Sequence, residues 1–357
     1  MLPYFSKHFG NAASKTHSLG WIAADAVKES RKDIANFLEC AEQEITFTSG
    51  STEAINLALK GVWEMYRGKG NEIITVGTEH KAVLDTCHFL AEKGAKIAVL
   101  PVDKNGLIDK SDLESAITDK TILVAIMLAN NETGVIQDLP EISKIIHEKG
   151  SILFSDTTQA WGKIPVDIHR CGIDICCFSA HKIYGPKGVG ALYARRKDPR
   201  VNLAPLLHGG GHERGLRSGT LNVPGIVGMG KAIQLLPAFQ KKYALVGKWR
   251  DEMESELKRS GKVKINGGEA VRLPNTSNFS IAGIKADSLI TKLPQLAMST
   301  GSACTSAIPE PSHVLKAMGI SEKESFSSIR ISLGINTTEE EIKNATLSLL
   351  QLINLSS

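Results

Sequence analysis

Lys182 stands in Ser179-Ala-His-Lys182, where an apolar run ends and a glycine-rich turn begins. A lysine in polar, tightly turned surroundings can form an imine with a carbonyl compound when burial or neighbouring cations lower its pKa. Most lysines that follow a strand are ordinary surface residues. Lys182 therefore has to be interpreted together with the polar residues that follow the other apolar runs of the chain.

Four other apolar runs end in polar residues. Thr48-Ser-Gly-Ser-Thr-Glu53 joins a glycine turn to hydroxyls at a helix start, which suits a phosphate, although plain N-capping explains it as well. Thr78-Glu-His80 presents an imidazole, although a lone histidine is usually structural or solvated. Asn130-Asn-Glu-Thr-Gly134 presents two amides, which ordinary turn chemistry also explains. Asp156-Thr-Thr-Gln159 places a carboxylate at the end of a buried run, where it needs a cationic partner.

The elements that must position these residues alternate over the first two-thirds of the chain. Helical patterns cover Trp21–Leu38 and Ser51–Tyr66, and this alternation predicts an α/β domain with a seven-stranded, largely parallel sheet. Ligands bind outside the carboxyl ends of such strands, so we expect the polar residues on one rim. The strand-like runs are Glu44–Gly50, Glu72–Val76, Lys96–Leu100, Thr121–Leu128, Ile152–Ser155, Ile173–Phe178 and Gly190–Ala194.

The predicted rim carries what pyridoxal phosphate requires. That cofactor needs a lysine for its aldehyde, a carboxylate for its pyridinium nitrogen and hydrogen-bond donors for its phosphate. Lys182, Asp156 and the turn around Ser51 and Thr52 supply these groups. The residues therefore predict a pyridoxal-phosphate site.

A smaller α+β domain is predicted after about residue 240. A polar helix from Lys241 to Ser260 leads into shorter elements, and the last helix is predicted to start at Thr337, with Glu340 completing a capping box. We therefore expect a large cofactor-binding domain over residues 1–235 and a small domain over 236–357. The predicted strands of the small domain are Val263–Ile265, Thr276–Ile281, Leu296–Ser299 and Ile329–Leu333.

Composition excludes several classes of protein. The 357 residues are 42% hydrophobic and 22% charged with a net charge of +4, and the scattered basic residues do not form the stripe expected of a nucleic-acid-binding protein. No apolar run approaches the roughly 20 residues of a membrane helix, and the amino terminus lacks a secretory layout, so we expect a cytoplasmic protein without membrane contact.

Cysteine and histidine spacing gives little sign of a metal site. The six cysteines form no CxxC pair, which favours free thiols in a reducing compartment over disulfides. Cys176 and Cys177 lie in a strand-like run and are expected to pack in the core. Three glycines separate His208 from His212, so the two rings need not share a face, and no metal is expected.

Longer motifs make the chain similar to a known family. They run in family order over nearly the whole chain, and together they resemble the NifS/IscS-like cysteine desulfurases, fold-type I pyridoxal-phosphate enzymes of the class V aminotransferase group. The motifs, besides those above, are Thr78-Glu-His-Lys-Ala-Val83, Ser179-Ala-His-Lys-Ile-Tyr-Gly-Pro-Lys-Gly188, His208-Gly-Gly-Gly-His-Glu-Arg-Gly-Leu-Arg-Ser-Gly-Thr220, Ser299-Thr-Gly-Ser-Ala-Cys-Thr305 and Ser328-Ile-Arg-Ile-Ser-Leu333.

The resemblance implies a role for each matched residue. Lys182 holds the cofactor as a Schiff base and removes the α-proton of the substrate, Asp156 pairs with the pyridinium nitrogen, and His80 stacks on the ring and shuttles protons. The remaining implied contacts are Gln159 with the phenolic oxygen, Ser51, Thr52, Ser179 and His181 with the phosphate, Thr220 with the phosphate of the neighbouring subunit of a homodimer, and Asn131 and Arg330 with the carboxylate of the substrate, L-cysteine.

Cys304 is implied to be the nucleophile that takes sulfur from L-cysteine as a persulfide, leaving L-alanine. Its small, polar surroundings favour an exposed, mobile loop over a buried structural position, and an attacking thiol must be accessible and able to ionise. The sulfur would then pass to an acceptor protein for iron–sulfur cluster assembly or for tRNA or DNA thiolation. The motifs leave the acceptor open, as well as a transient iron–sulfur cluster at Cys304.

The chain also departs from the family. Relatives open with a strand and an Asp/Asn-x-Ala-Thr-Thr segment near the substrate, and they carry a longer carboxyl-terminal tail; we expect both to be missing here, which puts full activity in question. Two alternatives therefore stay open. One is a selenocysteine lyase or another class V enzyme, and the other is a non-catalytic partner subunit.

Overall fold

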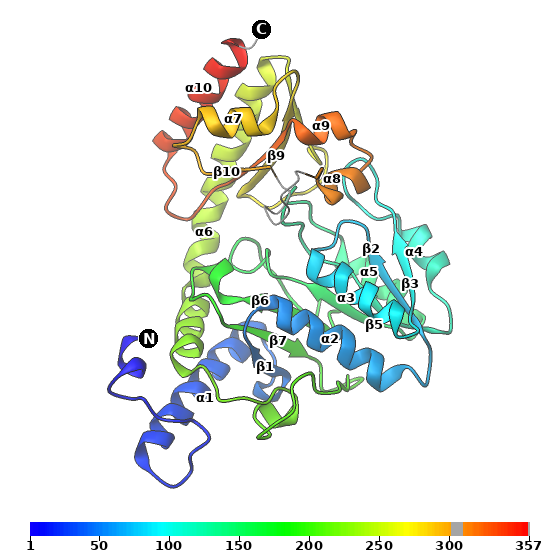
Figure 1. Ribbon diagram of the computed structural model, residues 1–357, viewed down its shortest axis with the longest axis vertical. Coiled ribbons are helices and arrows are strands. Elements are labelled where there is room, and N and C mark those ends of the chain that lie inside the picture. Colours follow the sequence, from blue (N-terminus) through cyan, green and yellow to red (C-terminus); the bar gives the residue numbers. More distant parts are fainter. Residues whose placement is uncertain (301–309, 356–357) are drawn as a thin grey trace.

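The computed structural model describes residues 1–300 and 310–355 (Figure 1). Its large domain is built on a seven-stranded sheet of order β1-β7-β6-β5-β4-β2-β3, in which β7 runs antiparallel to both neighbours and the other pairs are parallel. The prediction of a mostly parallel seven-stranded sheet is confirmed. The strands are β1 (Ile45–Thr48), β2 (Glu72–Val76), β3 (Lys96–Leu100), β4 (Thr121–Ala125), β5 (Ile152–Asp156), β6 (Ile175–Ser179) and β7 (Gly190–Ala194).

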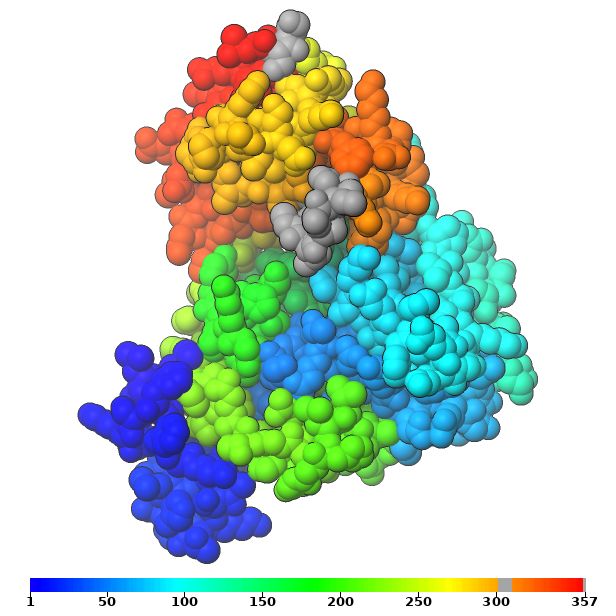
Figure 2. Space-filling view, in the orientation of Figure 1, coloured from blue at the N-terminus to red at the C-terminus, as the bar shows by residue number. Residues whose placement is uncertain are grey.

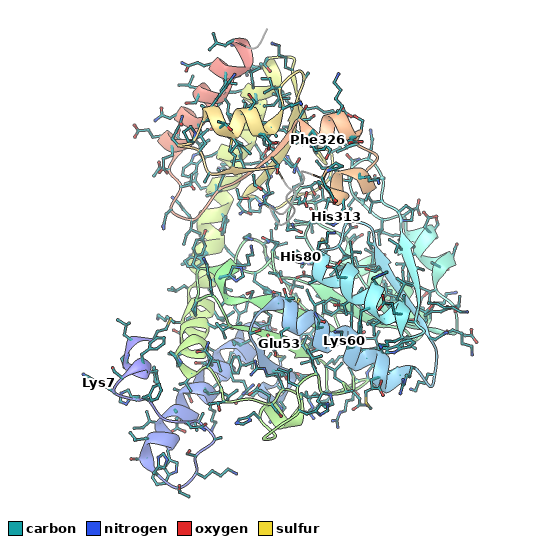
Figure 3. The ribbon with its side chains drawn as sticks, in the orientation of Figure 1. Lys7, Glu53, Lys60, His80, His313 and Phe326 are labelled. Carbon is teal, nitrogen blue, oxygen red and sulfur yellow. The ribbon has the colours of Figure 1, made fainter. Side chains whose placement is uncertain are left out.

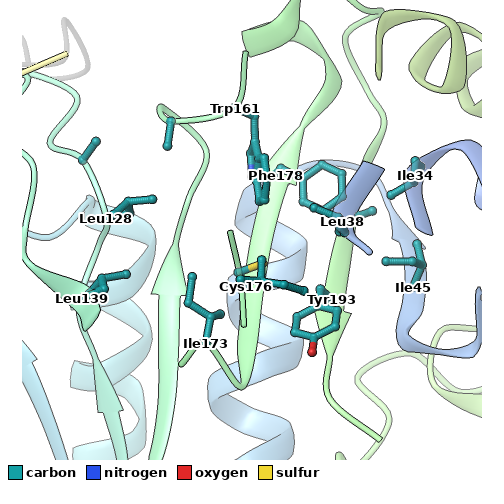
Figure 4. Close-up of a cluster of buried hydrophobic side chains, with 14 of the residues drawn as sticks. Ile34, Leu38, Ile45, Leu128, Leu139, Trp161, Ile173, Cys176, Phe178 and Tyr193 are labelled. Carbon is teal, nitrogen blue, oxygen red and sulfur yellow. The ribbon is translucent and has the colours of Figure 1, made fainter. Parts of the chain in front are cut away.

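Helices cover both faces of this sheet because successive strand side chains point to opposite faces. Cys176 packs with one core cluster and Cys177 with the other, so both are packing residues as expected. Around Cys176, the buried rings of Trp161, Phe178 and Tyr193 fill one core (Figure 4). This face is covered by α1 (Ser18–Leu38), α4 (Lys110–Ala116), α5 (Leu139–Glu148) and the first half of α6 (Val223–Arg259), and the other by α2 (Ser51–Tyr66) and α3 (Lys81–Glu92).

The carboxyl-terminal part forms a second, smaller α+β unit. Its antiparallel sheet has the order β10-β11-β9-β8. The strands are β8 (Val263–Ile265), β9 (Thr276–Ile281), β10 (Met298–Ser299) and β11 (Ser328–Ser332), with helices α7 (Ala286–Lys292), α8 (His313–Ala317), α9 (Glu322–Phe326) and α10 (Glu339–Leu355). Short 3-10 turns are η1 (Leu2–Phe5), η2 (Glu42–Glu44), η3 (Ala180–Ile183) and η4 (Glu213–Gly215).

Helix α6 joins the two units, and it begins well before the predicted Lys241. The glycines of its first turns and Pro237 inside it hide the helical pattern, because both residue types disfavour helix interiors. Side chains of α6 up to Leu236 belong to the core of the large sheet, and those from Tyr243 onward to the core of the small unit. The predicted division between residues 235 and 236 falls inside this continuous helix, beside Pro237, and stays a prediction.

The capping box of the last helix is one residue later than predicted. Thr338 and Glu341 form it: Glu341 N donates to Thr338 Oγ1, and Thr338 N donates to Glu341 Oε2 at 2.7 Å. Thr337 Oγ1 instead accepts from Gly334 N in the preceding turn. Because two adjacent threonines precede three glutamates, either Thr337 with Glu340 or Thr338 with Glu341 could form the box. The hydrogen bond from Gly334 N occupies Thr337, so Thr338 becomes the cap.

Candidate active site

A cavity of about 490 Å³ opens where β1, β2, β4, β5 and β6 end, and Arg330 of β11 closes it from the small unit. Figure 3 shows His80 near the boundary between the part that holds the large sheet and the part that holds the small one. All predicted site residues line this cavity except Thr220 and Cys304. Its lining comprises Ser49, Gly50, Ser51, Thr52, Glu53, Ile55, His80, Met127, Ala129, Asn131, Asp156, Thr158, Gln159, Ser179, His181, Lys182, Lys187, Gly188 and Arg330.

Asp156 ends β5 with a buried carboxylate that faces the cavity. Its Oδ1 accepts from Thr158 N at 2.9 Å and from the thiol of Cys177. In the described part of the chain no Lys, Arg or His forms an ion pair with it. A buried carboxylate is costly without a positive partner, so this position suits a protonated ring nitrogen supplied from outside the chain.

Lys182 lies on η3, immediately after β6, and reaches the cavity from the neighbouring strand end. Partial burial lowers its pKa below the usual range, the positive charge of Arg330 lowers it further, and Asp156 opposes this effect. A lysine with a lowered pKa has a larger fraction of neutral amine, which is the form that condenses with an aldehyde. Lys182 therefore has both the position and the environment of a reactive amine.

The amino terminus of α2 and the end of β6 form an anion-binding corner of the cavity. Gly50 caps α2 without a side-chain hydrogen bond, which leaves the first N–H groups of the helix open to an anion. Four hydroxyl or imidazole side chains surround this helix end, and they are paired: Ser51 with Thr158 at 2.7 Å, and Ser179 with Nδ1 of His181 at 2.8 Å. Burial lowers the pKa of His181, and Lys182 and Lys187 lower it further.

His80 is fixed by the helix that it begins. It is the N-cap of α3, and its Nδ1 accepts from Ala82 N at 3.1 Å. The proton of the neutral ring is therefore on Nε2. The helix start thus sets both the orientation and the tautomer of an accessible imidazole on the cavity wall.

Arg330 and Asn131 meet where the small unit closes the cavity. Arg330 Nη1 donates to the backbone oxygen of Asn131 at 3.0 Å, and Asn131 Oδ1 is buried without a hydrogen-bond partner in the described residues. No carboxylate of the described part of the chain forms an ion pair with Arg330. A guanidinium with free donors in a cavity suits a carboxylate ligand.

These groups together fit pyridoxal phosphate. The carboxylate of Asp156 without a cation suits the ring nitrogen, Lys182 suits the aldehyde, and the start of α2 suits the phosphate. Asp156 ends β5 and Lys182 follows β6, which are neighbours in the sheet, while α2 follows β1 on the other side of β7; all three groups share one cavity.

Two predicted site residues do not line this cavity. Thr220 is exposed and belongs to the loop after η4, which is held by the pairs Arg31–Glu213 and Glu53–Arg217 at 2.7 Å. Cys304 lies outside the described residues. Among the described residues, no group of three His, Cys, Asp or Glu side chains could hold a metal ion.

Two buried residues near the cavity were not singled out from the sequence. Glu132 is buried and accepts from Ser312 Oγ at 2.5 Å. Burial raises its pKa to about 7, while Ser312 and the charge of Arg330 lower it. Buried Lys163 donates to Gln159 at 2.8 Å. Glu132 stands in the Asn130–Gly134 turn, of which only the two amides were considered from the sequence. For Lys163 the one available signal is its four-residue spacing from Gln159.

Membrane insertion has no support from the helices. Throughout residues 1–300 and 310–355, no helix combines the length and apolar character needed to cross a bilayer.

Comparison with known proteins gives consistent results. Residues 1–345 match the family model described as aminotransferase class-V. The chain is 48% identical to cysteine desulfurase IscS of Rickettsia bellii, over 99% of this chain and 87% of that protein. Two solved structures are also similar: a NifS-like protein (TM-score 0.91, 36% identity, 99% of this chain and 94% of that one) and SspA in complex with cysteine (TM-score 0.82, 35% identity, 94% of each).

Proposed function

The chain belongs to the class V aminotransferase family, and within it to the pyridoxal-phosphate-dependent cysteine desulfurases. On that premise we propose that it converts L-cysteine to L-alanine and holds the released sulfur on Cys304. The observation that carries this proposal is the cavity in which Lys182, Asp156 and the open start of α2 meet. SspA, a structural relative, has been solved in complex with cysteine, which supports cysteine as the substrate class.

The cofactor would be held by the residues that its groups fit. Lys182 would take the aldehyde, Asp156 the ring nitrogen and Gln159 the phenolic oxygen, while His80 would stack on the ring. Ser51, Thr52, Ser179 and His181 would bind the phosphate together with the first N–H groups of α2. When bound, pyridoxal phosphate supplies an electron sink for the carbon next to the amino group.

The chain itself supplies the groups that bind the substrate and move its protons. Arg330 and Asn131 hold the carboxylate of L-cysteine, and the hydrogen bond from Arg330 to the backbone of Asn131 keeps the two residues on one side of the cavity. Lys182, with its lowered pKa, removes the α-proton and returns it. His80, whose Nε2 carries the proton in the neutral ring, shuttles protons from the opposite wall.

Sulfur transfer needs the thiolate of Cys304. The thiolate attacks the sulfur of the substrate: a sulfur–sulfur bond forms, the bond between Cβ and sulfur breaks, and the carbon takes up a proton. The products are a persulfide on Cys304 and L-alanine, so the substrate carbon is reduced and the transferred sulfur is oxidised. A second thiol on an acceptor protein then removes the sulfur.

We further propose that the active form is a homodimer in which Thr220 reaches the phosphate of the partner. Two observations support this. Thr220 is exposed and does not line the cavity of its own chain. The amino-terminal segment projects from the body (Figure 2) and exposes Leu2 at 82% and Phe9 at 78%, together with Phe5 and Trp21. Large apolar side chains gathered in this way mark an interaction surface.

We propose that the sulfur acceptor belongs to iron–sulfur cluster assembly or to thiolation of tRNA or DNA. We also propose that the enzyme works in the cytoplasm. The free cysteines of the described residues support a reducing compartment.

Turnover of the purified protein tests the activity. After reconstitution with pyridoxal phosphate, we expect L-cysteine plus a reducing thiol to yield sulfide and alanine in equal amounts. Selenocysteine turnover without cysteine turnover would favour a selenocysteine lyase. A protein that takes up no cofactor and makes no alanine would contradict the proposal.

A further inference from the structure

Lys163 is a buried amine next to the active site for which the proposed mechanism has no use. It lies in the turn after β5 and is only 8% exposed. Within the described residues it forms no ion pair, and its Nζ donates to Gln159 Oε1 at 2.8 Å. Lysine is rarely buried without a carboxylate partner, so this placement calls for an explanation.

The turn that carries Lys163 is held rigidly. Gly162 has φ +73°, and a Cβ there would lie 2.6 Å from Leu236 Cδ2, so α6 packs directly against the turn. Trp161 is buried, and its indole nitrogen donates to Thr157 Oγ1 at 2.7 Å. These contacts hold the turn in a conformation that directs the side chain of Lys163 inward and not into solvent. Its contact with Gln159, which lines the cavity, places the amine on the cavity side of the turn. Burial, together with the charge of Lys182, lowers the pKa of Lys163 to about 7.

The hydrogen bond between Lys163 and Gln159 determines which way the amide faces. In its protonated form Lys163 can donate but cannot accept, and its Nζ donates to Gln159 Oε1 at 2.8 Å, so the charged lysine holds the amide oxygen toward itself. The NH₂ group of Gln159 is then left for the cavity, which Gln159 lines. Without Lys163 the amide could turn by half a revolution and present its oxygen to the cavity instead.

We infer that Lys163 is a positioning residue that holds the amide of Gln159 with its N–H groups toward the cavity, so that the site accepts an oxyanion there. The inference rests on the proposed function, because the oxyanion is the phenolic oxygen of the cofactor. Lys163 acts only through Gln159 and does not touch the cofactor. The contribution of Lys163 to the affinity for pyridoxal phosphate should therefore disappear when Gln159 is absent.

A double-mutant cycle tests this dependence, with affinity for pyridoxal phosphate measured on the cofactor-free full chain. Lys163→Met should weaken binding about fivefold, as expected for one lost hydrogen bond, and should add no loss to Gln159→Ala. The exposed Lys144→Met serves as a matched control and should bind like the wild type. Equal losses from Lys163→Met in the wild-type and Gln159→Ala backgrounds would overturn the inference.

A second variant tests the orientation without altering Lys163. Gln159→Glu keeps the shape and the acceptor for Lys163, but it replaces the NH₂ group that faces the cavity with an oxygen. We expect it to bind pyridoxal phosphate more weakly than Gln159→Ala, and binding tighter than Gln159→Ala would overturn the inference. A wild-type chain that binds no cofactor would overturn the proposed function as well, so the two failures are distinguishable.

Discussion

Asp156, Lys182 and Arg330 show how charge is arranged at the residue scale. Among the described residues neither the buried carboxylate nor the guanidinium forms an ion pair, and the pKa of the amine is lowered. Isolated charges of this kind are unfavourable in a finished protein core. They become favourable when the cofactor brings a cationic nitrogen and an aldehyde, and the substrate a carboxylate, to the same cavity.

Two lysines of the cavity wall allow a direct test of the amine. Lys182→Ala should abolish the visible absorbance of the lysine-bound cofactor, because, of the two lysines that line the cavity in the described residues, Lys182 is the one that follows β6 and whose pKa responds to Asp156. Lys187→Ala, which removes another lysine from the same wall, should keep it. Absorbance spectra of both proteins with pyridoxal phosphate check this, and an unchanged Lys182→Ala spectrum would contradict the assignment.

Glu132 predicts a pH dependence of stability. Its pKa is about 7 in the folded chain because burial raises it from 4.5. Between these values the folded state holds a proton that the unfolded state has lost, so the free energy of unfolding falls as pH rises from 4.5 to 7. Relative to Glu132→Gln, the wild type should lose up to about 3 kcal/mol over this window. Urea unfolding at pH 5 and pH 8 measures it, and parallel changes in both proteins would refute it.

At the scale of elements, the loop after β4 is tied to the small unit along its length. Leu273 N donates to the backbone oxygen of Gly134 at 2.7 Å, and Asn278 Nδ2 donates to that of Glu132 at 3.2 Å. Ser312 and His313, at the start of α8, bind the Glu132 carboxylate and the backbone oxygen of Glu79. Figure 3 shows His313 at the same boundary as His80. These hydrogen bonds keep Arg330 of the small unit over the strand ends of the large sheet.

The ion pair between Arg272 and Glu254 anchors this connection to α6. Both side chains are 6% exposed and are joined by two hydrogen bonds of 2.7 Å. Arg272→Ala leaves a buried carboxylate unpaired and should lower the free energy of unfolding by about 3–5 kcal/mol. Arg272→Met combined with Glu254→Leu should cost much less. Chemical denaturation measures both, and equal losses in the two proteins would contradict the role of the pair.

The sequence predicted most of the strands and the cavity residues because both depend on local patterns. Ser51–Tyr66 is the helix that was expected, and Asp156, Ser179 and Lys182 lie at strand ends: Asp156 and Ser179 are the last residues of β5 and β6, and Lys182 follows β6. The start of α6 was missed because Gly225, Gly228 and Pro237 weaken the helical signal, and only packing against α1 and the large sheet overrides it. Glu132 was missed because its partner Ser312 is distant in the chain, and Lys163 because a four-residue spacing from Gln159 alone does not distinguish it from a surface lysine.

For the whole molecule, the proposal that matters most is that two chains complete each site. Thr220 then acts on the partner's cofactor, while Lys182 acts within its own chain. Mixed dimers of Lys182→Ala and Thr220→Ala would contain one site with both residues intact. We expect activity of the mixture to exceed the mean of the two separate variants after subunit exchange. A mixture that only equals this mean would show that Thr220 acts within its own chain or has no role.

The most direct measurement is the mass of the peptide that contains Cys304 after the protein has reacted with L-cysteine without reductant. The account predicts that this peptide gains the mass of one sulfur atom while an equal amount of L-alanine appears. In Cys304→Ala, the cofactor absorbance should remain while persulfide and alanine are lost. Alanine formed at the wild-type rate by Cys304→Ala, or sulfur bound to another cysteine, would contradict the account.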